Sequence, residues 1–159
     1  YARMPETSAF LTWCPHTDIE YTKNYLAFVI SKYKAGEFYD WAVTLKDEEN
    51  KMIGTCGFSR IDFSNDVGEI GYVINPDFQG HGYATEAVRA IMRFGFEKLD
   101  FNRIEAKFII GNDASLAVMQ KCGMQYEGMA RGAMLIKGRY RDIGTCAILH
   151  SEAQEELLK

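Results

Sequence analysis

Apolar residues recur every three to four positions in three stretches of this chain, which predicts three helices. The first runs from Ile19 to about Ala35, with Asp18 as its N-cap and Gly36 at its end. The second covers 84–99, and the third covers 114–121 with Asn112 or Asp113 as its cap. The apolar residues that recur on one face of the first helix are expected to pack in the core: Tyr21, Tyr25, Phe28 and Val29.

Shorter apolar runs bounded by turn-forming residues predict six strands. These strands are expected at Phe38–Leu45, Met52–Asp62, Val67–Asn75, Arg103–Ile110, Tyr126–Ile136 and Asp142–His150. Turns at Asp47–Asn50 and Asp62–Asp66 join the first three into an antiparallel meander, and the last two form a hairpin. The predicted fold is α/β, a mixed and mostly antiparallel sheet with helices on its faces.

Composition fits one globular domain over residues 1–159, because that length and 47% hydrophobic residues allow a real core. The net charge of −4 gives no reason to expect a nucleic-acid partner. No apolar run reaches the roughly 20 residues that cross a bilayer, and no signal peptide is visible, so no membrane partner is expected.

The cysteines form no CxxC pair and no cluster with histidine, so no zinc site is expected. Reduced, buried thiols are the favoured interpretation, and they point to the cytoplasm. The four residues concerned are Cys14, Cys56, Cys122 and Cys146.

One segment, Gln79–Ala87, carries the clearest chemical signal, because it joins a strand-like run at Glu69–Ile74 to the second helix. The amide groups that open a helix have no internal partner, and the helix dipole adds positive charge there. Gly80 and Gly82 allow positive φ and a close approach of an anion. The segment predicts a phosphorylated cofactor, although a plain glycine turn that only starts a helix is the alternative. A Walker loop and a nicotinamide fold are disfavoured, because their glycine and lysine spacings are missing.

The pattern Gln79-x-x-Gly82-x-Ala84 resembles the acyl-CoA loop of the GNAT N-acetyltransferases. A second stretch resembles another GNAT segment, with a methionine where the family has phenylalanine. It comprises Asn112-x-x-Ser115, a helix, and then Lys121-x-Gly123-Met124-x-x-Glu127-Gly128. The order of both segments, and a turn expected at Arg139–Asp142, resemble the branch that acetylates the N-termini of ribosomal proteins. The resemblance runs from about Trp13 to His150.

The resemblance implies a splayed pair of strands that holds acetyl-CoA as cosubstrate, and a first strand that is missing or short in this numbering. Backbone groups of Val73 and Ile74 would hold the pantetheine arm and the thioester carbonyl. Asn112 would bond the pantetheine, act as a helix cap, or do both. The residues that would cradle the pyrophosphate are Gln79, Gly80, His81, Gly82, Tyr83 and Ala84.

The resemblance also implies direct transfer of acetyl to an amine, which attacks only when neutral. Glu69 is the first candidate base, with Glu105 second. The alternative interpretation is that Glu69 is only a solvated carboxylate. Ser115 matches the serine near the cofactor sulfur and would protonate the leaving thiolate, or it is only a helix-start residue. Two positions depart from the family pattern, since Met119 and Met134 stand where related enzymes carry a tyrosine acid and a glutamate.

Other polar residues have smaller expected roles. His81 is expected to shape its loop, and His16 and His150 show no convincing partners. A basic cluster is expected to be a solvated hairpin, or a contact for the 3′-phosphate of CoA or an acidic substrate; it comprises Arg131, Lys137, Arg139 and Arg141. The leading function is N-acetylation of a protein N-terminal α-amine. The alternatives are acetylation of a polyamine or other small amine, and a non-catalytic acyl-CoA sensor.

Overall fold

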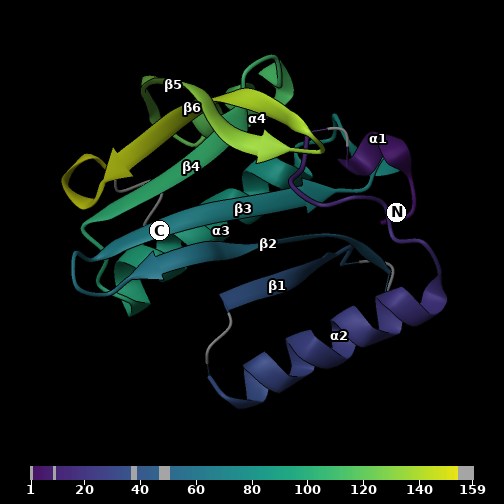
Figure 1. Ribbon diagram of the computed structural model, residues 1–159. Helices are drawn as coiled ribbons and strands as arrows, with labels where there is room; N and C mark the ends of the chain where they lie inside the picture. The colour runs from purple at the N-terminus through teal and green to yellow at the C-terminus, as the bar shows by residue number, and fades with distance from the viewer. Residues whose placement is uncertain (1, 9, 37–38, 47–50, 154–159) are drawn as a thin grey trace.

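A computed structural model describes residues 2–8, 10–36, 39–46 and 51–153 of the chain. Its centre is a six-stranded sheet in the order β1-β2-β3-β4-β6-β5, shown in Figure 1. The strands are β1 (Tyr39–Thr44), β2 (Met52–Asp62), β3 (Val67–Ile74), β4 (Arg103–Ile109), β5 (Gln125–Ile136) and β6 (Arg139–Leu149). Neighbouring strands pair antiparallel except β3 and β4, which pair parallel. The predicted mixed, mostly antiparallel sheet is confirmed. The expected turn at Asp47–Asn50 lies outside the described residues.

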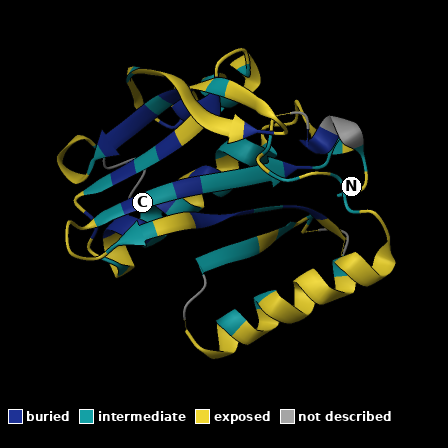
Figure 2. Cartoon of the chain, in the orientation of Figure 1, coloured by how far each residue is buried: buried dark blue, intermediate teal, exposed yellow. Residues whose placement is uncertain are grey.

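Two helices cover one face of this sheet: α3 (Tyr83–Lys98) and α4 (Asp113–Lys121) (Figure 1). The buried side of α3 packs against β2 and β3, as its apolar spacing predicts. The main core joins the two helices to the sheet, and Figure 2 shows its strand segments in dark blue. Its largest fully enclosed side chains include Phe96, Phe101, Met92, Ile104 and Met119.

The parallel pair β3 and β4 is joined along only half its length. Val67–Ile70 pairs with Arg103–Ala106, and within the described chain the strands have no further ladder contacts with each other. β3 nevertheless continues to Ile74, and β4 to Ile109. The two strands therefore diverge toward the end from which the loop after β3 emerges, as the predicted fold requires.

Helix α2 (Ile19–Lys34) forms where the periodicity predicts it, because Asp18 accepts a hydrogen bond from the Tyr21 amide at 2.8 Å. Its predicted core stripe is wrong, however. The helix has no buried residue, and Tyr21 and Phe28 are 53% and 52% exposed (Figure 2). Helical spacing identifies an apolar face, but burial needs a second layer over that face, and α2 lies beside β1 at the sheet edge (Figure 1).

The last two strands form the expected hairpin, but the turn lies elsewhere. Lys137 and Gly138 form it, with φ of 49° and 75°. Two central residues with positive φ are typical of the tight turn that matches strand twist. The turn expected at Arg139–Asp142 is therefore wrong, since those residues lie inside β6. The Lys137 ammonium donates to Ser8 of α1 (Pro5–Ser8), a one-turn helix.

All four cysteines are free, as expected. Three are buried, and burial raises the pKa of the Cys122 thiol to about 11. Cys14 departs from the expectation of burial, because it is exposed. None of the helices in the described ranges has the length and apolar character needed to cross a membrane. A short 3₁₀ helix, η2 (His150–Glu152), follows β6.

Candidate active site

The loop between β3 and α3 has the conformation that its glycines predict. Gly80 and Gly82 have φ of 80° and 88°, and a Cβ at either position would meet no atom within 4 Å. The glycines are therefore needed for the backbone conformation and leave open space above the loop. The first bond of α3 runs from the Glu86 amide to the Gly82 carbonyl at 3.0 Å. The amides before Glu86 form the unpaired N-terminal end of the helix, which suits a phosphate group.

Two side chains fix the shape of this loop. The Gln79 amide donates to the Ile74 carbonyl at 2.9 Å and ties the loop to the end of β3. His81 Nδ1 donates to the Gln79 carbonyl at 2.8 Å, and its ring stacks on Tyr83 at 5.8 Å between centroids. His81 thus has the loop-shaping position expected of it. A 3₁₀ helix, η1 (Pro76–Phe78), connects the strand to the loop.

Backbone directions along β3 decide which groups reach the gap beside β4. The Asn75 amide donates to Ile53 of β2 at 2.7 Å, so the alternate residue Val73 also directs its backbone groups toward β2. Ile74 lies between them and directs its carbonyl to the other side, where Gln79 binds it. Ile74 therefore presents its backbone toward the gap, whereas the Val73 side chain lines a cavity on the sheet face.

Ser115 and Asn112 meet at the start of α4, next to a residue that the sequence did not single out. The Asn112 side chain accepts from the Ser115 amide at 3.2 Å, so Asn112 is the helix cap. The Tyr72 hydroxyl lies 2.7 Å from Ser115 Oγ and donates to the Ser115 carbonyl at 3.0 Å. Burial raises the pKa of the Tyr72 phenol, which therefore stays protonated. Met119 lies in the core, 1% exposed.

The two candidate base residues belong to one network of charges on the sheet face opposite α3. Lys107 bonds to Glu69 and lies 3.4 Å from Glu105, while Arg103 lies 3.0 Å from Glu105 and 2.6 Å from Glu127. The bond to Glu69 is the main cause that raises the pKa of Lys107. Glu69 is therefore held by a cation, and Ser59 also donates to it at 3.3 Å.

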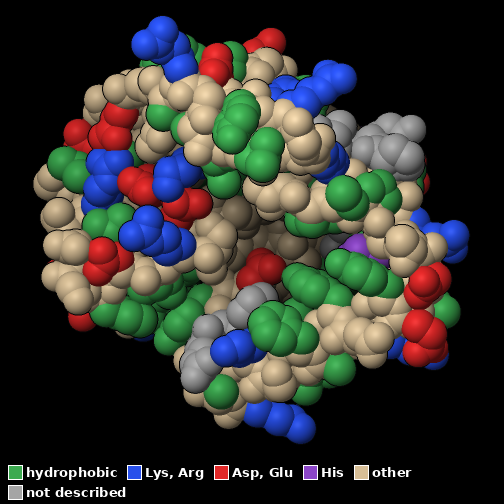
Figure 3. Space-filling model, viewed as in Figure 1, with side chains coloured by type: hydrophobic (Ala, Val, Ile, Leu, Met, Phe, Trp, Pro, Cys, Tyr) green, Lys and Arg blue, Asp and Glu red, His purple; other side chains and the backbone are tan. Residues whose placement is uncertain are grey.

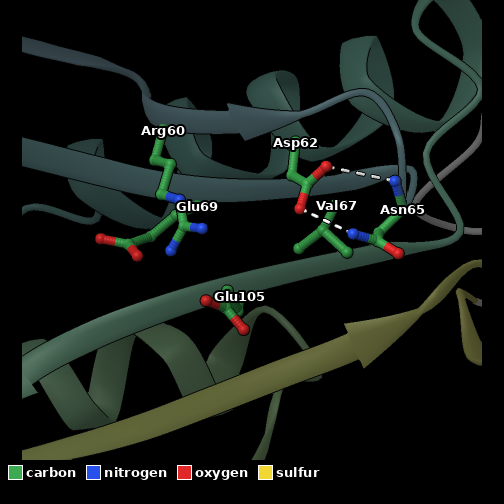
Figure 4. Close-up of a pocket in the computed structure, with 6 residues that line it drawn as sticks. All are labelled: Arg60, Asp62, Asn65, Val67, Glu69 and Glu105. Atoms are coloured by element: carbon green, nitrogen blue, oxygen red, sulfur yellow. Dashed lines mark hydrogen bonds between the residues drawn. The ribbon is translucent and has the colours of Figure 1, made fainter.

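A small pocket opens beside this network, of about 280 Å³. Figure 4 shows Arg60 of β2, Glu69 of β3 and Glu105 of β4 turned toward it. Asp62 closes one end, because its carboxylate accepts hydrogen bonds from Asn65 in the turn between β2 and β3. Its lining carries one cation, Arg60, and three carboxylates, and Lys107 and Arg103 of the adjoining network bind two of those carboxylates.

A larger cavity, of about 650 Å³, lies on the same sheet face and extends toward α2. Figure 3 shows it as a hollow with acidic atoms at its base. Segments far apart in the chain line it, namely Leu11–Trp13, Tyr25 of α2, Asp40 of β1, and Gly71–Val73 of β3. It thus reaches the part of β3 that diverges from β4.

Asp40 is the functional candidate that sequence reasoning missed. Burial is the main cause that raises the pKa of this carboxyl from 3.8 to about 6. Asp40 in turn contributes to the raised pKa of Tyr25 and of Tyr33 on α2. In the sequence Asp40 is one polar residue in an alternating strand, and only the pairing of β1 with β2 shows that it faces a cavity.

Several other predicted candidates lie apart from these groups. His16 bonds Thr22 at 2.9 Å and contacts the rings of Trp13, Tyr21 and Tyr25, so it has the partners that the sequence did not reveal. His150 also has a partner, because its ring stacks on Phe96 at 5.2 Å between centroids. In the basic cluster, Lys137 is engaged by Ser8 of α1, and Met134 is paired with Arg141 at the hairpin.

Comparison with known proteins gives the class of this molecule. Residues 1–125 match the model of the acetyltransferase (GNAT) domain, and the chain belongs to this family. It is 32% identical over 148 residues to an uncharacterized N-acetyltransferase of Bacillus licheniformis, covering 93% of this chain and 83% of that protein. It is also 32% identical over 108 residues to the putative ribosomal N-acetyltransferase YdaF of Bacillus subtilis, covering 68% and 59%.

Solved structures agree with this assignment. A GNAT-family acetyltransferase from Bacillus anthracis superposes with a TM-score of 0.83 at 28% identity, over 96% of this chain and 86% of that one. The loop, the divergent strands and the family together make this protein a GNAT N-acetyltransferase, an enzyme class that uses acetyl-CoA as cosubstrate.

Proposed function

We propose that this protein transfers acetyl directly from acetyl-CoA to a primary amine in the cytoplasm, with a protein N-terminal α-amine as the leading acceptor. The observation that carries the cofactor assignment is the loop Gln79–Ala84, which opens α3 beside the divergent ends of β3 and β4. The acceptor assignment rests on sequence relatives, among them YdaF and a protein named ribosomal-protein-serine acetyltransferase in Escherichia coli.

The residues present fit acetyl-CoA. The unpaired amides at the start of α3 and the open space above Gly80 and Gly82 suit the pyrophosphate. Further residues of the same loop complete the cradle: Gln79, His81, Tyr83 and Ala84. Ile74 offers backbone groups to the pantetheine arm in the gap, Val73 lines the adjoining cavity, and Asn112 stands at the far side of the gap as the cap of α4.

The proposed chemistry needs an amine without its proton. The nitrogen attacks the thioester carbonyl carbon, the carbon–sulfur bond breaks, and coenzyme A leaves as a thiolate. Backbone amides in the gap stabilise negative charge on the carbonyl oxygen. Glu69 accepts the proton of the amine, directly or through water, because it projects from the same face of β3 as Val73.

Ser115 supplies a proton to the thiolate and regains one from solvent. Its hydroxyl is held at 2.7 Å by Tyr72, which fixes its direction at the start of α4. Proximity of the amine and the thioester supplies a further part of the rate.

Two other functions have specific support. A polyamine or small amine as acceptor is supported by a relative named spermidine N(1)-acetyltransferase in Vibrio cholerae, 25% identical over 108 residues. A non-catalytic acyl-CoA sensor is supported by Met119 and Met134, which cannot donate a proton.

One experiment separates these functions. The protein is incubated with acetyl-CoA and, in turn, with N-terminal peptides, polyamines and monoamines, and free thiol is measured. Release of thiol with peptides supports the leading function, and release with polyamines alone supports the second. Saturable binding of acetyl-CoA without thiol release from any amine would support the sensor and contradict an enzymatic role.

A further inference from the structure

The floor of the large cavity contains a row of three residues that leaves one carboxylate uncovered. Asp40 of β1 is opposite Gly57 of β2, which is opposite Gly71 of β3. A Cβ at Gly57 would lie 2.3 Å from the Asp40 Cα, so a side chain cannot be accommodated there without displacing β1. Gly57 alone therefore separates Asp40 from β3, and the row from Asp40 to Gly71 spans about 10 Å, because strands are about 5 Å apart.

Asp40 differs from Glu69, Glu105 and Glu127 in having no ion-pair partner among the described residues. Glu69 is bound by Lys107, and Glu127 is bound by Arg103, which also reaches Glu105. Across the residues that the structure describes, no lysine, arginine or histidine forms an ion pair with Asp40. A half-buried carboxylate in an open cavity thus lacks the positive partner that such a group normally acquires.

Aromatic rings around the cavity also suit a bound cation. Trp13 of the N-terminal segment and Tyr25 of α2 line the same cavity as Asp40. Faces of aromatic rings attract cations, and a carboxylate among such rings is a suitable environment for an ammonium group. The cavity is also continuous with Gly71–Val73, the part of β3 beside the gap assigned to the cofactor.

We propose that Asp40 binds a second positively charged group of the acceptor, distinct from the amine that is acetylated. This proposal rests on the proposed function, because it takes the acetyl group to lie at the gap beside β3. The 10 Å row then separates the two ends of the acceptor. A linear diamine or polyamine carries such a second charge, and so does a peptide with a lysine or arginine near its N-terminus.

The same geometry predicts a dependence on pH. Burial raises the pKa of Asp40 to about 6, and only the ionised carboxylate attracts a cation. The titratable groups nearest Asp40 are Tyr25 and Tyr33 of α2 and Cys56 of β2, and Arg60 of β2 lines the same cavity. Burial raises the pKa values of the two phenols and of the thiol, so these groups stay protonated near pH 6 and Asp40 is the one among them that changes there.

The test compares acceptors that differ only in the second charge. Diamines are compared with monoalkylamines of equal length, and N-terminal peptides containing lysine are compared with the same peptides containing norleucine. Each is assayed with the parent, Asp40→Asn, Asp40→Glu and the control Glu97→Gln, which removes an exposed charge on α3. Acetyl-CoA binding is measured in parallel by thermal shift.

Asp40→Asn is expected to raise KM for doubly charged acceptors about tenfold to a hundredfold, since a charge-assisted contact is lost. KM for the partners that lack the second charge, and the affinity for acetyl-CoA, should stay at the parental values. Asp40→Glu should recover part of the loss, and Glu97→Gln should have no effect. In the parent, KM for the doubly charged acceptor should fall as pH rises through about 6, and Asp40→Asn should abolish that change.

The outcomes separate this proposal from the proposed function. One outcome is thiol release that depends on an amine, with Asp40→Asn changing KM equally for acceptors with and without the second charge. That outcome would overturn only the role of Asp40. Absence of thiol release from every amine would instead overturn the proposed function. An effect confined to diamines, or one confined to peptides, identifies which kind of acceptor supplies the second charge.

Discussion

Glu69 shows how a single neighbour changes what a residue can do. The sequence presents it as a carboxylate on a strand, but the structure places the Lys107 ammonium against it. Lys107 and the Ser59 hydroxyl both bond to the Glu69 carboxylate and fix its position on the sheet face. The proposed base is therefore a held side chain and not a mobile surface carboxylate.

We expect Glu69→Gln to lower turnover by about a hundredfold near pH 7, because the variant cannot accept the proton of the amine. The loss should shrink as pH rises, since the amine then loses its proton without help. The check is a series of steady-state rates from pH 6.5 to 9.5, a range of about three units around the amine pKa. Cofactor affinity is measured alongside. Glu105→Gln serves as a matched variant in the same charge network. Parental turnover in Glu69→Gln at pH 7 would leave Glu69 as a surface ion-pair residue.

Ser115 provides the second prediction at this scale. Ser115→Ala is expected to slow acetyl transfer about tenfold or more while weakening acetyl-CoA binding less, because the thiolate loses its nearest proton donor. Tyr72→Phe should produce a smaller slowing, since it removes only the 2.7 Å contact that directs the hydroxyl. Rates and affinity measured together distinguish the roles. An equal fall in both would make Ser115 a binding residue, and no change in either would make it only a helix-start residue.

At the scale of elements, the loop and α3 together form the proposed anion site. The conformation of the loop depends on positive φ at Gly80 and Gly82, and the amides of the first turn depend on the helix that follows. The divergence of β3 from β4 supplies the adjoining gap. None of these elements would form the site alone.

The substitution Gly82→Asp tests whether the loop and the start of α3 bind acetyl-CoA. Acetyl-CoA at about 100 times its dissociation constant should add roughly 2.7 kcal/mol to the stability of the parent. The variant should lose most of that gain, because it combines an unfavourable φ of 88° with a negative charge at the phosphate position. Thermal unfolding with and without acetyl-CoA is the measurement, and Asp77→Asn in η1 is a nearby control. Equal shifts in parent and Gly82→Asp would contradict the loop assignment.

At the scale of the whole molecule, the two faces of the sheet carry different groups. The face under α3 and α4 holds the core, whereas the opposite face holds the charge network and the large cavity (Figures 2 and 3). A raised carboxyl pKa opposes folding at neutral pH, because the folded state then holds a charge that it solvates poorly. Asp40 therefore links the proposed acceptor cavity to the stability of the fold.

Stability is expected to fall as pH rises from about 4 to about 6, as far as Asp40 contributes. Below the ordinary pKa of 3.8 the carboxyl is protonated in both states, and above about 6 the full cost of its charge applies. Asp40→Asn should remove this dependence and stabilise the protein at pH 7 by on the order of 1 kcal/mol, a value reduced for partial exposure. Denaturant unfolding at pH 4, 5, 6 and 7, a series that runs from just above the ordinary pKa of 3.8 to above the folded-state value of about 6, provides the measurement. Parallel curves for parent and variant across this range would contradict it.

The sequence by itself determined the features that depend on neighbours in the chain. The cap at Asp18, the glycine loop before α3 and the extents of β2, β3 and α4 follow from local spacing, and the structure has them within a residue or two. Helix caps, positive φ and alternation act over a few residues, so their signals are complete in the sequence. The family resemblance added the splayed pair of strands, which local patterns do not specify, whereas the order of the strands in the sheet came from the structure.

Only the tertiary structure determined which residues of different elements contact one another. It brought Tyr72 to Ser115, 43 positions away in the chain, and Lys107 to Glu69, 38 positions away. It left the apolar face of α2 uncovered and placed Asp40 in one row with two glycines of neighbouring strands. Each of these outcomes depends on strand register and on which layer covers which face. Those are properties of long-range packing, and the hydrophobic pattern of a single segment carries no information about its partner.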